Sequence, residues 1–459
     1  MSDACRPRGL WILVSAVLIA ALAACTLAAC TLAGSATAGD PPRTERSRPD
    51  TSEPDQSAVI DKIALWDNAT GPHLRGVNVA QRRNYPEIND WRVLGWNPAG
   101  PPFDQVDFAE IAAMGANVVM LTHPAPFGER PPYAFEPDTE ANLERLVALA
   151  HEADLFVVIA FKTGPGRSTF SFFPGGAGDW FPESLFNDTV WASREAQDAW
   201  AVAWRRTAER FRGHPAVIGY ELMIEPNSNR VGSDYLTDRL RIGEPAVFHE
   251  RYGGTLYDWN QFFPRIVAAI REVDPDMPLL VGGNGYSAID FLPFVEPVAD
   301  PNTVYVVHNY NPYVYTNQKP DKPLDYPGRF DADWDEVEDR VDRAFLDALY
   351  GPVDVFRRTH GVSVGVTEFG VFRWAPGADR FIDDQIAVME ARGLNHIMYT
   401  WDTRYPGYMR LKNPSLFRFG PDLEYRRPLR GNPVTEVLRQ NWKKNIVRPS
   451  NVTFAETRS

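Results

Sequence analysis

Short runs of apolar residues, rich in branched aliphatic side chains, alternate along this chain with longer stretches in which apolar and polar residues recur at helical spacing. This alternation is typical of repeated strand and helix units arranged around a parallel sheet. Eight runs have the length and composition of strands. They are 74–79, 117–121, 156–161, 217–223, 279–282, 304–308, 363–367 and 396–400. Eight parallel strands are the number that closes a (β/α)₈ (TIM) barrel, so this fold is predicted, with a single catalytic domain.

Six segments between the strands are predicted to be helices because their apolar residues repeat at helical spacing. They are 103–114, 140–153, 195–212, 256–273, 334–359 and 379–392. The interval between the fifth and sixth strands offers only a short, irregular candidate, around 289–298. In such a barrel the catalytic residues lie at the C-terminal ends of strands and in the loops that follow. Candidate chemistry is therefore sought at these strand ends.

The N-terminus has the pattern of an export signal. Two arginines precede an apolar run over 10–22, which is too short for a comfortable membrane span. The run leads into Leu-Ala-Ala-Cys at 22–25, repeated at 27–30, and both resemble the bacterial lipobox, whose cysteine is lipidated after cleavage. We therefore expect a signal peptide over 1–30, a lipid anchor on Cys25, with Cys30 of the second repeat as the alternative, and an exported, membrane-anchored protein of the cell envelope.

An ordinary secretory signal, cleaved in the alanine-rich stretch near Ala36 or Ala38, is the alternative. Residues 31–58 are rich in Ser, Thr, Pro, Arg and Asp, and they cannot offset their ordering entropy by burial. A disordered tether is predicted there, followed by the barrel domain over 59–447 and a C-terminal tail over 448–459. All three cysteines precede the tether, so the folded domain has no disulfide.

Charge and motif content narrow the function classes. The chain has 60 acidic and 47 basic residues, a formal net charge of −13, which would repel nucleic-acid phosphates, so no nucleic-acid partner is expected. The eight histidines show no metal-ligand spacing such as His-Glu-x-x-His, and no glycine-rich phosphate loop follows a strand. We expect no metal, no organic cofactor and a monomeric protein.

Two of the predicted strands end in a carboxylate. The fourth strand leads into Glu225, which is followed by a proline, and the seventh leads into Glu368 in Val-Thr-Glu-Phe-Gly. Strand ends four and seven lie across the mouth of a barrel from each other. Retaining glycosidases need two carboxyl groups about 5 Å apart, one to protonate the leaving oxygen and one to attack the anomeric carbon.

With these carboxylates, a His-x-Tyr after strand six and a Trp after strand eight, the chain resembles the clan of (β/α)₈ retaining glycosidases that includes family 5 cellulases and mannanases. The resemblance covers most of residues 70–405 and implies that Glu225 is the acid/base and Glu368 the nucleophile. It further implies that His308 lies near the acid/base, that the hydroxyl of Tyr310 contacts the nucleophile, and that Trp401 forms the floor of the sugar site.

Three positions depart from the family's pattern. The family's Asn before the acid/base is Ile224 here, its strand-two Arg aligns with Met120, and its strand-three His has no clear equivalent. The family's Asn holds the sugar 2-hydroxyl, and bonds to that hydroxyl contribute several kcal/mol in the transition state. The loss suggests that the reacting sugar carries something other than an ordinary equatorial 2-hydroxyl.

Polar residues at neighbouring strand ends could offset these losses. His123, Lys162 and Arg167 are candidates to supply charge and donors to the substrate, and Asn227 is a further candidate. Lys162 or Arg167 near Glu368 would favour its ionised form.

Glu221 faces the same way as Glu225 by strand alternation, one layer deeper, and is expected to be a structural group. The aromatic-rich segment 163–191 is either a self-packed cluster or a wall for further sugar subsites.

The sequence therefore predicts an exported, retaining β-glycoside hydrolase that acts on an oligo- or polysaccharide by double displacement. Glu225 would protonate the departing oxygen while Glu368 attacks, and Glu225 would then activate water. The alternative is a non-catalytic carbohydrate-binding barrel lipoprotein, in which the altered supporting residues mark lost turnover while the cleft still holds a glycan.

Overall fold

The computed structural model describes residues 59–88, 103–179, 181–230, 245–318, 321–401 and 433–456. The predicted signal peptide, Cys25 and the predicted tether lie outside the described residues. Among the helices that are described, none has both the length and the apolar character needed to cross a membrane.

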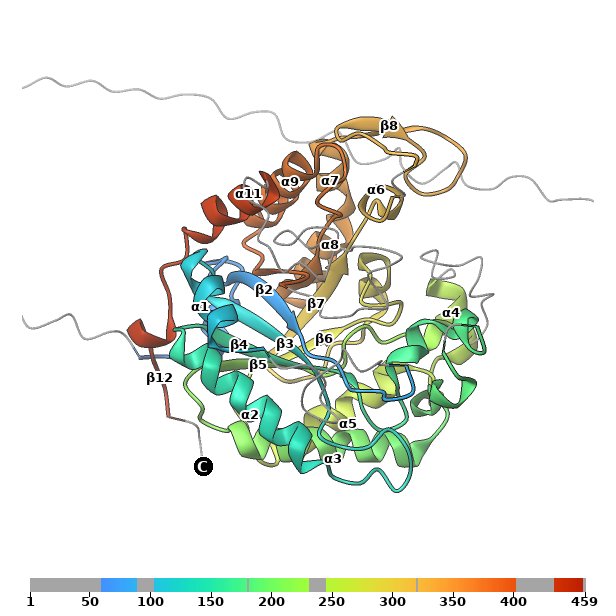
Figure 1. Cartoon of the computed structure of the whole chain (residues 1–459), viewed down its shortest axis with the longest axis vertical. Coiled ribbons are helices and arrows are strands. Elements are labelled where there is room, and N and C mark those ends of the chain that lie inside the picture. The colour runs from blue at the N-terminus through green and yellow to red at the C-terminus, as the bar shows by residue number, and fades with distance from the viewer. Residues whose placement is uncertain are drawn as a thin grey trace, which may run out of the picture. The chain divides into compact units, whose positions relative to one another are not determined.

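Eight parallel strands form a closed barrel, which confirms the predicted fold (Figure 1). Each strand pairs with the next along the chain, and the last returns to the first. Seven of the eight predicted strands overlap the observed ones over nearly their whole length, and the eighth is shorter. The strands are β2 (Arg75–Ala80), β3 (Val118–Pro124), β4 (Phe156–Thr163), β5 (Val217–Glu221), β6 (Leu279–Gly282), β7 (Thr303–Asn309), β10 (Val364–Phe369) and β11 (His396–Met398).

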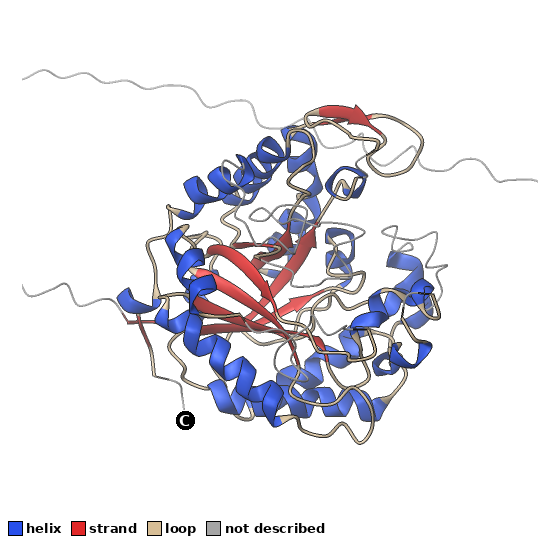
Figure 2. Cartoon of the chain, in the orientation of Figure 1, coloured by secondary structure: helices blue, strands red, loops and turns tan. Residues whose placement is uncertain are grey.

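Helices surround the barrel (Figure 2). The described helices are α1 (Gln105–Ala113), α2 (Pro137–Glu152), α3 (Arg194–Phe211), α4 (Pro245–Tyr252), α5 (Trp259–Arg271), α6 (Tyr313–Thr316), α7 (Arg343–Leu349), α8 (Gly351–His360), α9 (Ala378–Glu390) and α11 (Pro433–Trp442). The longer ones, such as α3 and α5, bury an apolar face and present a polar face to solvent. Between β6 and β7 there is a 3-10 helix, Ile289–Phe294, where the sequence offered only an irregular candidate.

The core has two layers because both faces of the strands are buried. Along β4, Phe156, Val158 and Ala160 belong to the cluster inside the barrel, and the residues between them pack against the outer helices. Trp66, from the 3-10 helix Lys62–Trp66, joins the inner cluster, and its indole N–H donates to the carbonyl of Ile218 at 3.1 Å.

The predicted helix over 334–359 is wrong at its start. Residues 339–341 are a strand, β9 (Asp339–Val341), which pairs with β8 (Gly328–Phe330) in a hairpin, and α7 begins only after its N-cap, Asp342. In the hairpin loop, backbone amides of residues 335 and 336 donate to the carboxylate of Asp331. Short acidic side chains that bond to nearby backbone groups compete with helix formation.

The ends of the described chain meet beside the barrel. β1 (Val59–Ile60) pairs in parallel with β12 (Thr453–Phe454), and Phe454 packs against the inner cluster. Arg448 donates to the carbonyls of Ala116 and Asp154. Residues 448–454, which were predicted as a tail, therefore contribute contacts to the barrel.

Candidate active site

Glu225 and Glu368 lie at one end of the barrel, as their places in the sequence predict. Glu368 is in β10, and Glu225 follows β5. Three atoms lie within 4.8 Å of one another: a carboxylate oxygen of Glu225, a carboxylate oxygen of Glu368 and a ring nitrogen of His308. The side chain of Glu368 is 4% exposed and that of Glu225 is 16% exposed. The separation is close to the roughly 5 Å that a retaining pair requires.

His308, in β7, is surrounded by carboxylates. Its Nδ1 lies 3.3 Å from Glu225 Oε1 and 3.7 Å from Glu368 Oε2, and its Nε2 lies 3.2 Å from Glu221 Oε1. Burial alone would lower the pKa of His308, but the charge of Glu368 and the hydrogen bonds to Glu221 and Glu225 outweigh burial and raise it well above its usual value. The surroundings therefore favour the imidazolium form, which can donate from both nitrogens.

Tyr310 makes the contact that the resemblance implies. Its hydroxyl donates to Glu368 Oε2 at 2.8 Å. Burial raises the pKa of Tyr310 well above its usual value, and the charges of Glu368 and Glu225 raise it further. The phenol thus remains a proton donor and fixes the orientation of the Glu368 carboxylate.

The ionisation of Glu225 and Glu368 is coupled, and burial favours a proton shared between them. Burial raises the pKa of Glu368 to about 7, the charge of Glu225 adds to this, and His308 and Lys162 oppose it. Burial would also raise the pKa of Glu225, but its hydrogen bond from His308 and the charge of Lys162 outweigh burial and lower it. Two carboxylates this close resist ionising together, so they titrate as a pair.

Lys162 lies where the hypothesis of compensating charge requires a cation. Its ammonium group lowers the pKa of both Glu225 and Glu368. It lies over the ring of Phe172, 4.5 Å from the ring centroid. Lys162, at the end of β4, thus supplies positive charge to a site that lacks the family's arginine.

Arg167 has a different place from the predicted one. Its side chain is fully buried, and its guanidinium donates to the carbonyl oxygens of Ile224 at 2.7 Å and Glu225 at 2.6 Å. The predicted contact with substrate is therefore corrected, because a group with no exposed surface cannot reach a sugar. Arg167 supports the backbone around Glu225 instead.

His123 and Asn227 are also corrected. His123 Nε2 lies 3.0 Å from the amide nitrogen of Asn142 on α2, and burial lowers its pKa to about 3, so it is a neutral group packed under the outer helices. Asn227 is 1% exposed, accepts a bond from Trp191 Nε1 and donates to the carbonyl of Ser171. Both residues hold loops in place and present no surface to a sugar.

Trp401 is part of the core. It is fully buried, and its indole N–H donates to Asp107 of α1 at 3.2 Å. The predicted sugar floor is therefore wrong for this residue. β11 ends at Met398, and the half-buried side chain after it, Tyr399, is close enough to Tyr310 to influence its pKa. Tyr399 was not among the predicted site residues, although strand alternation places it on the same face as the interior Ile397.

The departures from the family pattern converge in space. Met120 and Ile224, the two departures that can be aligned, both belong to the apolar cluster inside the barrel. These two positions are therefore apolar where the family has an Arg and an Asn.

The aromatic segment 163–191 is largely self-packed. Phe170 stacks on Phe181 with ring centroids 4.4 Å apart and meets Tyr85 edge-on at 4.8 Å. These contacts favour the cluster interpretation for these rings. Trp180, in the same segment, lies outside the described residues.

Two groups of side chains in the described residues are close enough to share one metal ion. The first is Glu225, His308 and Glu368, where the charges that keep His308 protonated oppose coordination by its ring. The second is the hairpin loop between β8 and β9, whose carboxylates accept bonds from amides of the same loop. Its three members are Asp331, Asp333 and Asp335.

The closed barrel and the carboxylate pair at one end of it define the class of (β/α)₈ glycoside hydrolases. Residues 78–404 match the family model described as cellulase (glycosyl hydrolase family 5). The chain belongs to this family and is a glycosyl hydrolase, a divergent member by its low identity to the relatives below.

Endoglucanase C of Acetivibrio thermocellus is 24% identical over 313 residues, which cover 62% of this chain and 79% of that protein. Cellodextrinase A of Ruminococcus flavefaciens is 26% identical over 177 residues, covering 39% of this chain and 42% of that protein. Among solved structures, endoglucanase Cel5A of Thermotoga maritima superposes with a TM-score of 0.56 at 15% identity, covering 83% of this chain and 100% of that chain. This last likeness supports the fold.

Proposed function

We propose that the protein is a retaining β-glycoside hydrolase that cleaves an extracellular oligo- or polysaccharide by double displacement, with Glu225 as acid/base and Glu368 as nucleophile. The observation that carries the proposal is the approach of the two carboxylates, whose oxygens lie within 4.8 Å of each other. This separation leaves room for one anomeric carbon and is too short for the intervening water of an inverting enzyme.

The surroundings of the two carboxylates support these separate roles. Glu368 is the more buried, and the bond from Tyr310 fixes its orientation, which suits direct attack on carbon. Glu225 is more exposed and lies on the segment after β5, where it can reach both a leaving oxygen and an incoming water. His308 contacts Glu225 and lies near Glu368. Its ring can therefore stabilise a negative charge on either carboxylate.

The proton of the pair must lie on Glu225 when reaction begins. A sugar that fills the cleft removes water from the partly exposed Glu225 and raises its pKa, while Tyr310 and Lys162 continue to stabilise the charge on Glu368. The proton then passes from Glu368 to Glu225 without a change in net charge.

Glu225 gives its proton to the departing oxygen as Glu368 forms an ester with the anomeric carbon. Water attacks that carbon, loses its proton to Glu225, and releases Glu368.

The names of the relatives and the apolar residue at position 224 indicate which substrates to test first. Relatives are called endoglucanase and cellodextrinase, so β-linked glucans are the first polymers to test. The apolar side chain of Ile224, in place of the family's Asn, supports the hypothesis that the reacting sugar differs at its 2-position. Rates on gluco, manno and 2-amino aryl β-glycosides test this point. Equal rates on all three would argue against it.

Export and anchoring through Cys25 remain part of the proposal, supported by the lipobox-like sequence at 22–25. Expression of the full chain in a bacterium, followed by fractionation, tests it. The wild-type protein is expected in the membrane fraction, and Cys25→Ser is expected to shift it to a soluble fraction. Equal distribution of both proteins would contradict lipidation at this cysteine.

The stereochemistry of hydrolysis tests the catalytic proposal. Proton NMR of a β-glucan digest is expected to show the β-anomer of the new reducing end first. Glu225→Gln and Glu368→Gln should each lower kcat by at least about 100-fold, while Glu390→Gln, at a half-buried carboxylate paired with His396, should not. An initial α-anomer would exclude retention. Binding of glycans without turnover would favour the carbohydrate-binding alternative.

A further inference from the structure

Glu225 has a backbone conformation that its own sequence disfavours. Its φ is +54°, in the left-handed region that is strained for non-glycine residues. The following residue, Pro226, favours an extended conformation with negative φ at position 225. The surrounding structure must therefore hold Glu225 in place, and the direction of its carboxylate depends on whatever does so.

Arg167 contacts the peptide groups on both sides of Glu225. Nη1 donates to the carbonyl of Ile224 at 2.7 Å and Nη2 donates to the carbonyl of Glu225 at 2.6 Å. These two peptide planes define φ and ψ of the residue between them. A planar guanidinium offers two donors at a fixed spacing, which the single ammonium of a lysine cannot reproduce.

The position of Arg167 is itself fixed by a tight turn. Gly164 and Arg167 exchange two backbone hydrogen bonds, of 3.0 and 2.8 Å. Gly166, between them, has φ +72°, and a Cβ there would lie 2.7 Å from the backbone nitrogen of Val190, so the turn requires glycine. The ring of Phe172 lies 4.7 Å from the guanidinium carbon.

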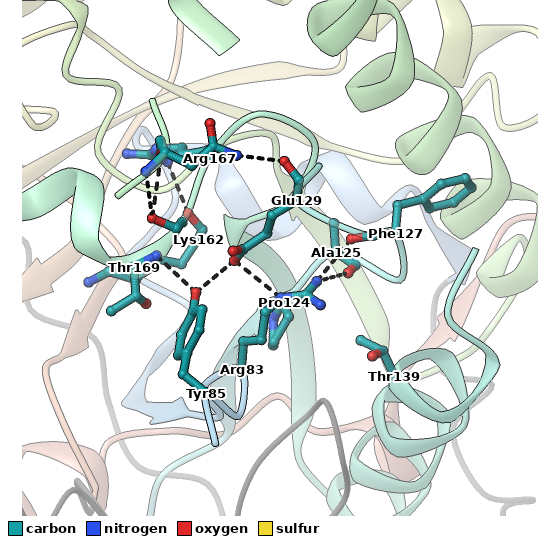
Figure 3. Close-up of polar contacts among 12 residues, drawn as sticks. Arg83, Tyr85, Pro124, Ala125, Phe127, Glu129, Thr139, Lys162, Arg167 and Thr169 are labelled. Atoms are coloured by element: carbon teal, nitrogen blue, oxygen red, sulfur yellow. Dashed lines mark hydrogen bonds and ion pairs between the residues drawn. The ribbon is translucent and has the colours of Figure 1, made fainter. Parts of the chain in front are cut away.

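A buried network fastens this turn from its other side (Figure 3). The carbonyl of Glu129 accepts from the amide of Gly166 at 3.0 Å, and its carboxylate accepts from the hydroxyl of Tyr85 at 2.6 Å. Tyr85 in turn accepts from the amide of Thr169 at 3.0 Å, and Arg83 pairs with Glu129 at 3.2 Å. Loops after three neighbouring strands thus converge on the segment that carries Arg167.

We propose that Arg167 is a positioning residue that holds Glu225 in its left-handed conformation through the two carbonyl bonds, and so aims the acid/base carboxylate at the leaving oxygen. The inference rests on the proposed function, because it assigns a purpose to the direction of Glu225. Arg167 acts through the backbone and does not touch the sugar, since it is fully buried.

Leaving-group dependence separates this role from a general loss of structure. A phenyl β-cellobioside needs protonation of its leaving oxygen, whereas the 2,4-dinitrophenyl analogue leaves without it. With Arg167→Lys, we expect kcat/KM for the phenyl substrate to fall by about 10-fold or more, within the roughly 10²–10⁴-fold contribution of a general acid. For the dinitrophenyl substrate it should change little. Equal losses on both substrates, or no loss, would overturn the proposal.

Arg448→Lys is the matched control, because Arg448 also donates to backbone carbonyls but lies away from the carboxylate pair. It should leave both rates unchanged. Glu225→Gln separates the two hypotheses. If Glu225→Gln shows the leaving-group effect and Arg167→Lys does not, only the role of Arg167 fails. If Glu225→Gln shows none, the acid/base assignment itself fails.

A crystal structure of Arg167→Lys gives a test that needs no substrate. We expect φ of Glu225 to become negative and its bond to His308 to be lost. An unchanged positive φ with that bond intact would contradict the proposal. If this variant does not fold, Tyr85→Phe, which removes the acceptor of the Thr169 amide, should shift the rate ratio of the two substrates in the same direction by a smaller factor. An unchanged ratio would count against it.

Discussion

Replacing Glu221 with glutamine removes a negative charge from the far side of His308 and keeps both its shape and an acceptor oxygen. Glu221 is fully buried, and its Oε1 lies 3.2 Å from His308 Nε2. Its other oxygen, Oε2, accepts no hydrogen bond from the described residues. The charge of Glu221 therefore acts mainly on His308, which in turn contacts Glu225 and lies near Glu368.

The size of the effect follows from this distance. Two unit charges about 4 Å apart interact by about 4 kcal/mol at an effective dielectric constant of about 20. Since 1.36 kcal/mol corresponds to a factor of ten, the proton affinity of His308 should fall by about two to three powers of ten in Glu221→Gln. The charged ring of His308 lowers the pKa of Glu225. At any pH at which Glu221→Gln has made the ring neutral, the pKa of Glu225 should therefore be higher than in the wild-type protein.

Nitrogen NMR of the imidazole ring measures this directly. In the wild-type protein both ring nitrogens of His308 should be protonated at pH 7, and in Glu221→Gln the ring should lose its proton at lower pH than in the wild type. Glu390→Gln is the matched control, because it removes a carboxylate 3.1 Å from Nε2 of a different buried histidine, His396. A neutral His308 in the wild-type protein at pH 7, or equal titration in both proteins, would refute the reasoning.

Three further predictions concern the same site. The proposed reaction needs one proton on the carboxylate pair, and burial raises the pKa of Glu368 to about 7. We therefore expect kcat/KM to fall about tenfold per pH unit above about pH 7. A profile that still rises at pH 8 would contradict the shared proton. Trp401→Phe removes a buried bond to Asp107 and should cost about 1–3 kcal/mol of stability in a denaturant titration, with KM unchanged. Tyr399→Ala should instead lower kcat/KM roughly tenfold, or ~1.4 kcal/mol, with a smaller change in stability. If Trp401→Phe lowered kcat/KM and Tyr399→Ala changed only stability, Trp401 would again be the candidate for the sugar floor.

The barrel could be predicted from the sequence because its strands are buried on both faces. Such strands are continuous apolar runs, and their spacing by helical segments defines the fold. The segment 334–342 could not be predicted in the same way. Its polar and apolar spacing suits a helix, but carboxylates of the loop bond to nearby amides, and this local competition is invisible to periodicity.

The site residues also fall into two groups, those that the sequence could predict and those that it could not. Glu225, Glu368, His308 and Tyr310 could be placed because each follows an apolar strand in a recognisable motif. The polar residues at the neighbouring strand ends could not, since sequence position does not reveal which way a side chain turns after its strand ends. The side chain of His123 points towards α2, and the guanidinium of Arg167 binds the backbone carbonyl of Glu225.

Covalent trapping tests the central claim most directly. The protein is incubated with a panel of 2-deoxy-2-fluoro β-glycosyl fluorides and digested, and its peptides are weighed. A retaining enzyme with the proposed nucleophile should gain one fluoroglycosyl mass on the peptide that contains Glu368, and Glu368→Gln should gain none. A label on another residue, or substrate turnover with no label at all, would contradict the account.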